Sequence, residues 1–240
     1  MYPQPIIIAA VLACVVVAPL SKAQPATKTP AITCTEGFEN VAQLTSRGWI
    51  IINRSDLLGT TSWFQGVPAR FPAQAGPSNS YASSDALNAS GQDAVLSTWL
   101  ITPDIPFADG STLDFATREL SAPTDESNRL EVLACFDSIS QSCTNVGDSS
   151  GSLGGFVNAL VIVNPGQVQG GYPSTWTFYS VTQAMGMPQS GHGRIAFHHY
   201  GNGHAMDPIG TTIGVDTVTV GQVVSCPFTD VVFNDGFESR

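Results

Sequence analysis

The apolar residues of this chain recur at every second position, and this period constrains the fold more than any other feature. Successive side chains of a β-strand point to opposite faces of a sheet, so the alternation indicates strands that are buried on one face. The segments that show it are rich in β-branched and aromatic residues and are bounded by turn-forming residues. They are Trp49–Asn53, Thr61–Gly66, Thr112–Arg118, Arg129–Phe136, Phe156–Val163, Thr175–Val181, Arg194–Tyr200 and Ile213–Val220.

Helical periodicity is weak throughout the chain. The nearest approach to an amphipathic helix is Ser180–Met187, and Gly186 interrupts it. Many short strands with turn residues between them are typical of a sandwich or a barrel. With 42% hydrophobic and 12% charged residues, the chain can bury one substantial core. We therefore expect a single all-β domain over residues 34–226.

The first residues predict export. Pro5–Leu20 is an apolar run that is too short to span a bilayer comfortably. Ser21 and Ala23 follow it with the small-x-small pattern that a signal peptidase recognises. We expect a signal peptide over residues 1–23, cleaved after Ala23. The mature protein is then secreted or held in the cell envelope, with no membrane insertion after cleavage.

The composition at the two ends predicts where the domain begins and ends, and the net charge excludes some classes of partner. Residues 24–33 are rich in Pro and Thr and are expected to form a flexible leader, and residues 227–240 to form a short C-terminal tail. The net charge is −10, and cleavage removes Lys22 and no acid, which leaves −11 on the mature chain. Nucleic acid and anionic membranes would repel this charge, so neither is an expected partner.

Four cysteines remain after export: Cys34, Cys135, Cys143 and Cys226. An even number of cysteines in an oxidising compartment predicts disulfides, and three pairings are possible. Cys135 and Cys143 flank a loop-like span that could close across a hairpin, which would leave Cys34 and Cys226 to join the two ends of the domain. None of the four has the spacing of a zinc site.

Gly147–Gly151, with the sequence GDSSG, fits the G-x-S-x-G pattern of a hydrolase nucleophile. Every histidine follows Ser149, which is opposite to the order in chymotrypsin-like proteases. The α/β-hydrolase order would allow a later histidine, but that fold needs helices between its strands. We interpret the segment as a Ser/Gly loop and expect no catalytic residues. The histidines are His192, His198, His199 and His204.

His198 and His199 raise the question of a transition-metal site, because imidazole is a common ligand of such metals. As neighbours on an expected strand, they would point to opposite faces of the sheet and could not easily bind one ion. We expect one of them to face the core or a neighbouring strand and the other to face solvent.

The four tryptophans divide by their neighbours. Trp49 and Trp99 lie within apolar runs and are expected in the core, where a large apolar ring stabilises the fold. Trp63 and Trp176 have polar neighbours. If the protein binds a glycan, we expect Trp63 or Trp176 to be the ligand-binding residue, because an exposed indole can stack on a sugar ring; the alternative is that both rings belong to the core.

The order of several sequence blocks resembles that of a known family. In sequence order these blocks are EGFEN, RGWIIIN, TSWFQG, SYASSDA, DAVLSTWLITPDI, STLDFATREL, STWTFYSV, GRIAFHHYG and TIGVDTVTV. The chain resembles the choice-of-anchor J family and its relative, the cleaved-adhesin domain, which is itself similar to MAM-type jelly rolls. The resemblance extends from Thr35 to Val220, and the Trp-Leu-Ile-Thr-Pro block is its most specific landmark.

The resemblance implies a fold, which is a jelly-roll β-sandwich of two antiparallel sheets. Because a jelly roll pairs its first and last strands, it implies the disulfides Cys34–Cys226 and Cys135–Cys143. It also implies that the Trp-Leu-Ile segment is a short strand packed into the sandwich, with Trp99 fixing the corner. Pro103 would end this strand, because proline lacks a backbone donor and restricts the residue before it.

The resemblance also implies a function. Relatives are non-catalytic domains of secreted or surface-attached bacterial proteins, and several bind calcium, which points to Glu39 and Asp216 as metal ligands here. Ser97-Thr98 and Val215-Asp216-Thr217 stand where relatives often have an acidic pair, so the calcium site is one carboxylate poorer. We expect a secreted, monomeric adhesion module that binds an extracellular glycan or protein. The alternatives are an exported glycosidase or peptidase and a structural envelope protein.

Overall fold

The computed structural model describes residues 32–91, 94–120, 128–136, 141–202 and 212–228, so the expected signal peptide and most of the leader and tail lie outside the described residues. Within these ranges the strands are β1 (Ile32–Glu36), β2 (Ile50–Asn53), β3 (Phe64–Gln65), β4 (Ala82–Ser84), β5 (Val95–Ile101), β6 (Ile105–Glu119), β7 (Leu130–Cys135), β8 (Asn158–Val163), β9 (Thr177–Val181), β10 (Gly191–Asn202) and β11 (Ile213–Val223). The helices described are short 3₁₀ turns: η1 (Val41–Gln43), η2 (Thr45–Arg47), η3 (Ala86–Asn88), η4 (Gln141–Thr144) and η5 (Gln183–Met185).

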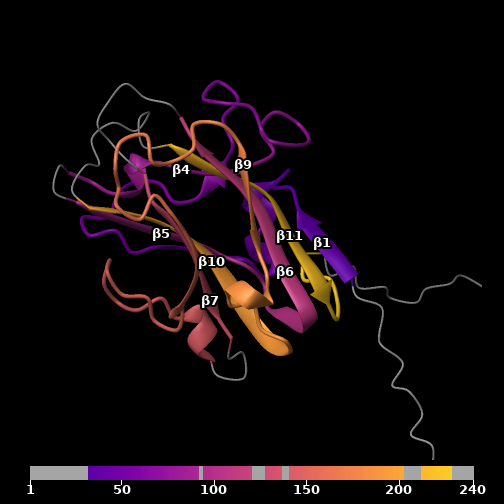
Figure 1. Ribbon diagram of the computed structural model, residues 1–240. Coiled ribbons are helices and arrows are strands. Elements are labelled where there is room, and N and C mark those ends of the chain that lie inside the picture. The colour runs from indigo at the N-terminus through magenta and orange to yellow at the C-terminus, as the bar shows by residue number, and fades with distance from the viewer. Residues whose placement is uncertain (1–31, 92–93, 121–127, 137–140, 203–211, 229–240) are drawn as a thin grey trace, which may run out of the picture.

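The strands pair antiparallel and form a sheet that curls into two layers (Figure 1). The first layer has the order β9–β6–β11, with β1 and β4 beside β11 and β3 beside β4. The second layer has the order β2–β5–β10–β7–β8. The layers join where Gly191–Gly193 of β10 pairs with Ile105–Phe107 of β6. This is the expected jelly-roll β-sandwich of two antiparallel sheets, and its first strand pairs with its last, as β1 lies beside β11.

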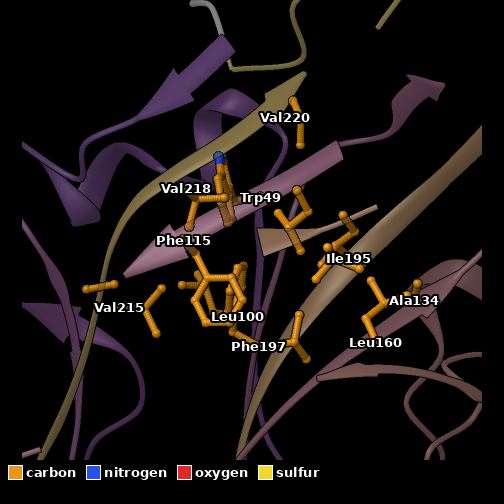
Figure 2. Packing of buried hydrophobic residues seen from close by; sticks show 14 of the residues in the cluster. Trp49, Leu100, Phe115, Ala134, Leu160, Ile195, Phe197, Val215, Val218 and Val220 are labelled. Atoms are coloured by element: carbon orange, nitrogen blue, oxygen red, sulfur yellow. The ribbon is translucent and has the colours of Figure 1, made fainter. Parts of the chain in front are cut away.

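The main core fills the space between the two layers. Figure 2 shows valines of β11 facing Ile195 and Phe197 of β10. Val215 and Val218 are three residues apart and would point to opposite faces of a regular strand. A β-bulge at this point, with Thr217 at a φ of 53°, turns both side chains inward. The same bulge leaves Asp216 on the outer face of the first layer.

Pro103 ends β5 as expected. The strand stops at Ile101, and the next residue, Thr102, closes the ladder through hydrogen bonds with the backbone of Ile195. Trp99 is fully buried, but it lies in a second, smaller core on the outer face of the second layer. The expected core position of Trp99 is therefore confirmed, although the core that it joins is the smaller of the two. Leu100 points inward instead, and its neighbour Trp99 points outward, beneath residues 143–156.

Two disulfides join the cysteines in the expected pairs. Cys34 of β1 bonds to Cys226, and Cys135 at the end of β7 bonds to Cys143 in η4. The second bond holds residues 143–156 against the outer face of the second layer, and we call this stretch the covering segment. Within the described ranges, no helix combines the length and the apolar character needed to cross a bilayer.

Candidate functional site

An aromatic cluster lies on the outer face of the first layer. Gly214 of β11 is its floor, because a Cβ at this position would lie 2.9 Å from atoms of Phe71, Tyr81 and Trp176. The Trp176 ring meets the other two rings edge-on, with centroids 5.7 Å apart in each case. Its Nε1 donates a hydrogen bond of 2.9 Å to the carbonyl of Pro72. These contacts fix the orientation of the Trp176 ring and leave it half-buried.

Phe178 extends this cluster along β9. Trp176 immediately precedes β9 and Phe178 lies within it, so the two-residue spacing places both side chains on the outer face of the layer. Phe178 is 60% exposed, whereas its neighbour Tyr179 faces the core and stacks on Phe115 with centroids 5.2 Å apart. We call Trp176 and Phe178 the β9 aromatic pair. Phe178 was not among the expected ligand-binding residues, although the alternation of TWTFYSV assigns it to the same face as Trp176.

A cation supports the cluster from one side. The Arg118 guanidinium lies 4.5 Å from the centroid of the Phe71 ring, and its Nη2 donates to the carbonyl of Ser174. Burial lowers the pKa of Arg118 and raises that of Tyr81. The raised pKa keeps the Tyr81 phenol neutral near neutral pH. The cluster therefore offers rigid ring faces beside a fixed positive charge.

Trp63 does not offer a ring face. Its side chain is 4% exposed and belongs to the main core, so the expectation that it binds a ligand at the surface is wrong. Its polar neighbours, which suggested exposure, are engaged within the protein. The Ser62 hydroxyl lies 3.2 Å from that of Thr98. The Gln65 amide bonds to the backbone, with its Nε2 donating to Phe38 and Asn79 and its Oε1 accepting from Val41.

Glu39 and Asp216 lie at the same end of the first layer, because Glu36 of β1 pairs with Val218 of β11. The Asp216 carboxylate is fully buried and accepts three backbone N–H bonds. These come from Gln74 at 2.8 Å, Ala75 at 3.2 Å and Thr217 at 2.6 Å. Burial outweighs these bonds and raises the pKa of Asp216 to about 6.

The loop at residues 74–76 lies between these two acids. A Cβ on Gly76 would lie 3.9 Å from Oε1 of Glu39, whose side chain is exposed. Among the described residues, no cation forms an ion pair with Asp216, and no group of three or more His, Cys, Asp and Glu side chains could hold a metal ion. The oxygens of Asp216, Glu39 and the Gln74 side chain suit a hard cation, but they provide few charged ligands.

The histidine pair alternates across β10 as expected, with His199 toward the first layer and His198 toward the outside. The expectation that one of them faces solvent is wrong, because each is 1% exposed and the covering segment lies over the outer face. The His199 ring bonds to Ser84 Oγ through Nδ1 at 2.8 Å and to Asn128 Oδ1 through Nε2 at 3.1 Å. Burial lowers the pKa of His199 to about 3. His204 lies outside the described residues.

Two serines bear on the hydrolase alternative. Ser149 of the GDSSG loop is exposed, and its hydroxyl lies 2.8 Å from that of Ser152. Ser97 on β5 has the connectivity of a catalytic triad, since its Oγ lies 2.9 Å from Nε2 of His198, whose Nδ1 lies 2.9 Å from Oε2 of Glu131. Ser97 is, however, fully buried, so its hydroxyl is not placed to attack a substrate.

Comparison with known proteins gives likenesses of fold. No family model matches the sequence, and no curated protein matches it. The K1 cleaved adhesin domain of Lys-gingipain from Porphyromonas gingivalis is a similar solved structure, with 23% identity, coverage of 79% of this chain and 97% of that chain, and a TM-score of 0.48. The K3 domain of the same protein has 20% identity, coverage of 80% and 99%, and a TM-score of 0.49. A family 11 carbohydrate-binding module from Clostridium thermocellum has 11% identity, coverage of 81% and 95%, and a TM-score of 0.42.

Proposed function

We propose that this protein is an exported, non-catalytic binding module that holds an extracellular glycan against the β9 aromatic pair. The observation that carries the proposal is the Phe178 ring, which is 60% exposed on the same outer face as the half-buried Trp176. An aromatic face stacks on the apolar face of a sugar ring, and a ring that is already fixed loses little entropy on binding. The hydrogen bond from Trp176 to Pro72 and its contacts with Phe71 and Tyr81 provide that fixation.

Other features of the chain support this setting. The two disulfides suit an oxidising compartment, which agrees with secretion or residence in the cell envelope. The net charge of −10 disfavours nucleic acid as a partner. We propose that the module acts as a monomer, and a protein ligand on the same aromatic surface is the second possibility for its partner.

We further propose that calcium stabilises the module at Glu39 and Asp216. Burying the negative charge of Asp216 costs free energy, because no cation among the described residues forms an ion pair with it. A hard cation would offset that cost. The loop that calcium would fix includes Gln74, whose backbone N–H donates to Asp216. The same loop begins at Pro72, whose carbonyl accepts the hydrogen bond from Trp176. Calcium would thus stiffen the same loop that positions the binding surface.

Binding to an array of extracellular glycans tests the proposal. Phe178→Ala removes a ring that packs little within the protein, so the variant should melt like the parent but bind the selected glycan at least tenfold more weakly. Leu58→Ala is the matched control, because Leu58 is 63% exposed and is not part of the β9 aromatic pair. Equal binding by the parent and by Phe178→Ala would refute the role of the pair.

An exported hydrolase is the alternative function, and the chain Ser97–His198–Glu131 is the observation that favours it. If it were correct, the protein would hydrolyse activated esters such as nitrophenyl acetate, and Ser97→Ala would abolish the activity. Because Ser97 is fully buried, we expect parent and variant to release nitrophenol at the same background rate. Activity that is lost in Ser97→Ala would replace the binding proposal with an enzymatic one.

A further inference from the structure

A cleft of about 340 Å³ lies on the outer face of the second layer, where β7 and β10 emerge beside the covering segment. Pockets of this size can hold a small molecule. The cleft has no part in the β9 aromatic pair, which lies on the outer face of the other layer. Its lining residues are Arg129, Glu131, Gly151, Leu153, His198 and Tyr200.

The floor of the cleft is a directed chain of hydrogen bonds. Burial opposes ionisation of Glu131, but the bond from His198 and the charge of Arg129 outweigh it and lower the pKa of Glu131. An ionised carboxylate only accepts, so Nδ1 of His198 donates to it. Burial lowers the pKa of His198, so the ring is neutral and its Nε2 accepts from the hydroxyl of Ser97. That hydroxyl oxygen accepts in turn from Nε1 of Trp99 at 3.3 Å.

Stacking holds the same floor rigid. The rings of Trp99 and His198 are nearly parallel, at 14°, with centroids 3.7 Å apart. Phe156 of the covering segment also packs against Trp99, with their ring centroids 5.8 Å apart. The groups that face the cleft are therefore fixed before any ligand arrives, which reduces the entropic cost of binding.

The chemistry of the lining selects among ligands. Arg129 and Glu131 form an ion pair, so their charges cancel and neither an anion nor a cation finds an unopposed partner. The Arg129 side chain is 24% exposed at the cleft, and its guanidinium has five N–H donors, so it can still donate to a ligand oxygen. Tyr200 and Leu153 add apolar surface. A ligand that fits must be neutral, carry hydroxyl groups and present one apolar face.

We infer that this cleft is a second carbohydrate site, which holds one neutral sugar residue. Its hydroxyls would bond to Arg129 and Glu131, and its C–H face would lie against Tyr200 or Leu153. The covering segment forms one wall, so the cleft takes a chain end or a free monosaccharide, whereas Phe178 of the β9 aromatic pair is 60% exposed. The inference stands on different residues from the proposed function, and either can fail alone.

Gly151 allows the cleft to be closed without disturbing its floor. A Cβ at this position meets no atom within 4 Å, so Gly151→Trp would extend a side chain at the mouth of the cleft at little cost in stability. Ser190→Trp is the matched control, because Ser190 is exposed and precedes the end of β10 that lies away from the cleft. Leu153→Ala is a second cleft variant that removes apolar surface instead of adding it.

Calorimetric titration with glucose, galactose, mannose and N-acetylglucosamine, and with glucuronate and glucosamine as charged comparators, tests the inference. We expect at least one neutral sugar to bind at least tenfold more tightly than the charged ones. Gly151→Trp should weaken its binding at least tenfold and Leu153→Ala several-fold, while Ser190→Trp binds as the parent does. The inference is overturned if no neutral sugar binds, if a charged sugar binds as tightly, or if Gly151→Trp leaves the affinity unchanged. Loss in Phe178→Ala alone would place the sugar on the β9 aromatic pair and equally overturn it.

Discussion

His199 should make the protein sensitive to acid in a way that can be isolated. Its ring is enclosed between Ser84 and Asn128, and burial lowers its pKa from 6.5 to about 3, with nearby His198 adding to the effect. The unfolded chain takes up a proton below pH 6.5, but the folded protein does not. The contribution of His199 to the free energy of unfolding is therefore complete above pH 6.5 and is lost as the pH falls toward 3. The slope is about 1.4 kcal/mol per pH unit, so the loss between pH 7 and pH 5 is about 2 kcal/mol.

The measurement must separate the loss of stability due to His199 from a gain of stability that Asp216 produces over the same pH range. Asp216 has a raised pKa of about 6, so the folded state binds its proton more tightly and gains stability as the pH falls toward 5. We therefore compare His199→Gln with the parent by urea unfolding at pH 7, 6 and 5. A glutamine can donate to Asn128 and accept from Ser84 without titrating, so the variant should be less stable at pH 7 but should lose about 2 kcal/mol less than the parent on acidification.

The control is His192→Gln, which removes an exposed imidazole that bonds to Asp104 at 2.6 Å. This variant controls for replacing an imidazole with an amide at the surface of the protein. The contrary result is that the free energy of unfolding changes by the same amount in His199→Gln and in the parent between pH 7 and pH 5. That result would show that the enclosed ring does not stay neutral in the folded state. The account of the buried network would then be incorrect.

Two further predictions concern the ends of the domain. Calcium at a hundredfold excess over its Kd should stabilise the parent by about 2.7 kcal/mol in thermal melts against EGTA, and Asp216→Asn should lose this response. Identical melting temperatures with and without calcium would remove the site. Replacing Cys34 and Cys226 with serine opens a loop with a sequence separation of 192 residues and should destabilise the domain by about 5 kcal/mol in the chain-entropy model. Urea unfolding measures this, and a variant as stable as the parent would show that the bond adds nothing to stability.

The strands were predictable because their side chains alternate. Arg129–Phe136 and Ile213–Val220, expected from this period, correspond to β7 and β11 almost residue for residue. β4 was missed, since its sequence Ala-Ser-Ser carries no apolar alternation and it is held by pairing with β11 and β3. Thr61–Gly66 was overestimated, because only Phe64–Gln65 forms a strand there.

The candidate sites were harder to predict, for a physical reason. Local sequence indicates that a side chain points away from the main core, but not whether another segment covers it. Trp99 and His198 share the outer face of the second layer and are buried only because the covering segment, which is irregular and rich in Gly and Ser, folds over them. The cleft exists where this cover ends, so neither its position nor its lining could be read from the period of the strands. Trp63 shows the converse, because its polar neighbours Ser62 and Gln65 bond to a side chain of β5 and to the backbone within the fold.

The bond between Cys34 and Cys226 also has a mechanical consequence. It places the first and last parts of the sandwich 5.5 Å apart between Cα atoms and joins them covalently. A pull on the polypeptide from both flanks would pass through two sulfur atoms and would bypass the strands enclosed between them. The sandwich would carry no tension along the chain, so its binding surfaces would keep their shape while the protein is stretched. Reduction of this single bond would transfer the load to the β1–β11 ladder and make the domain extensible.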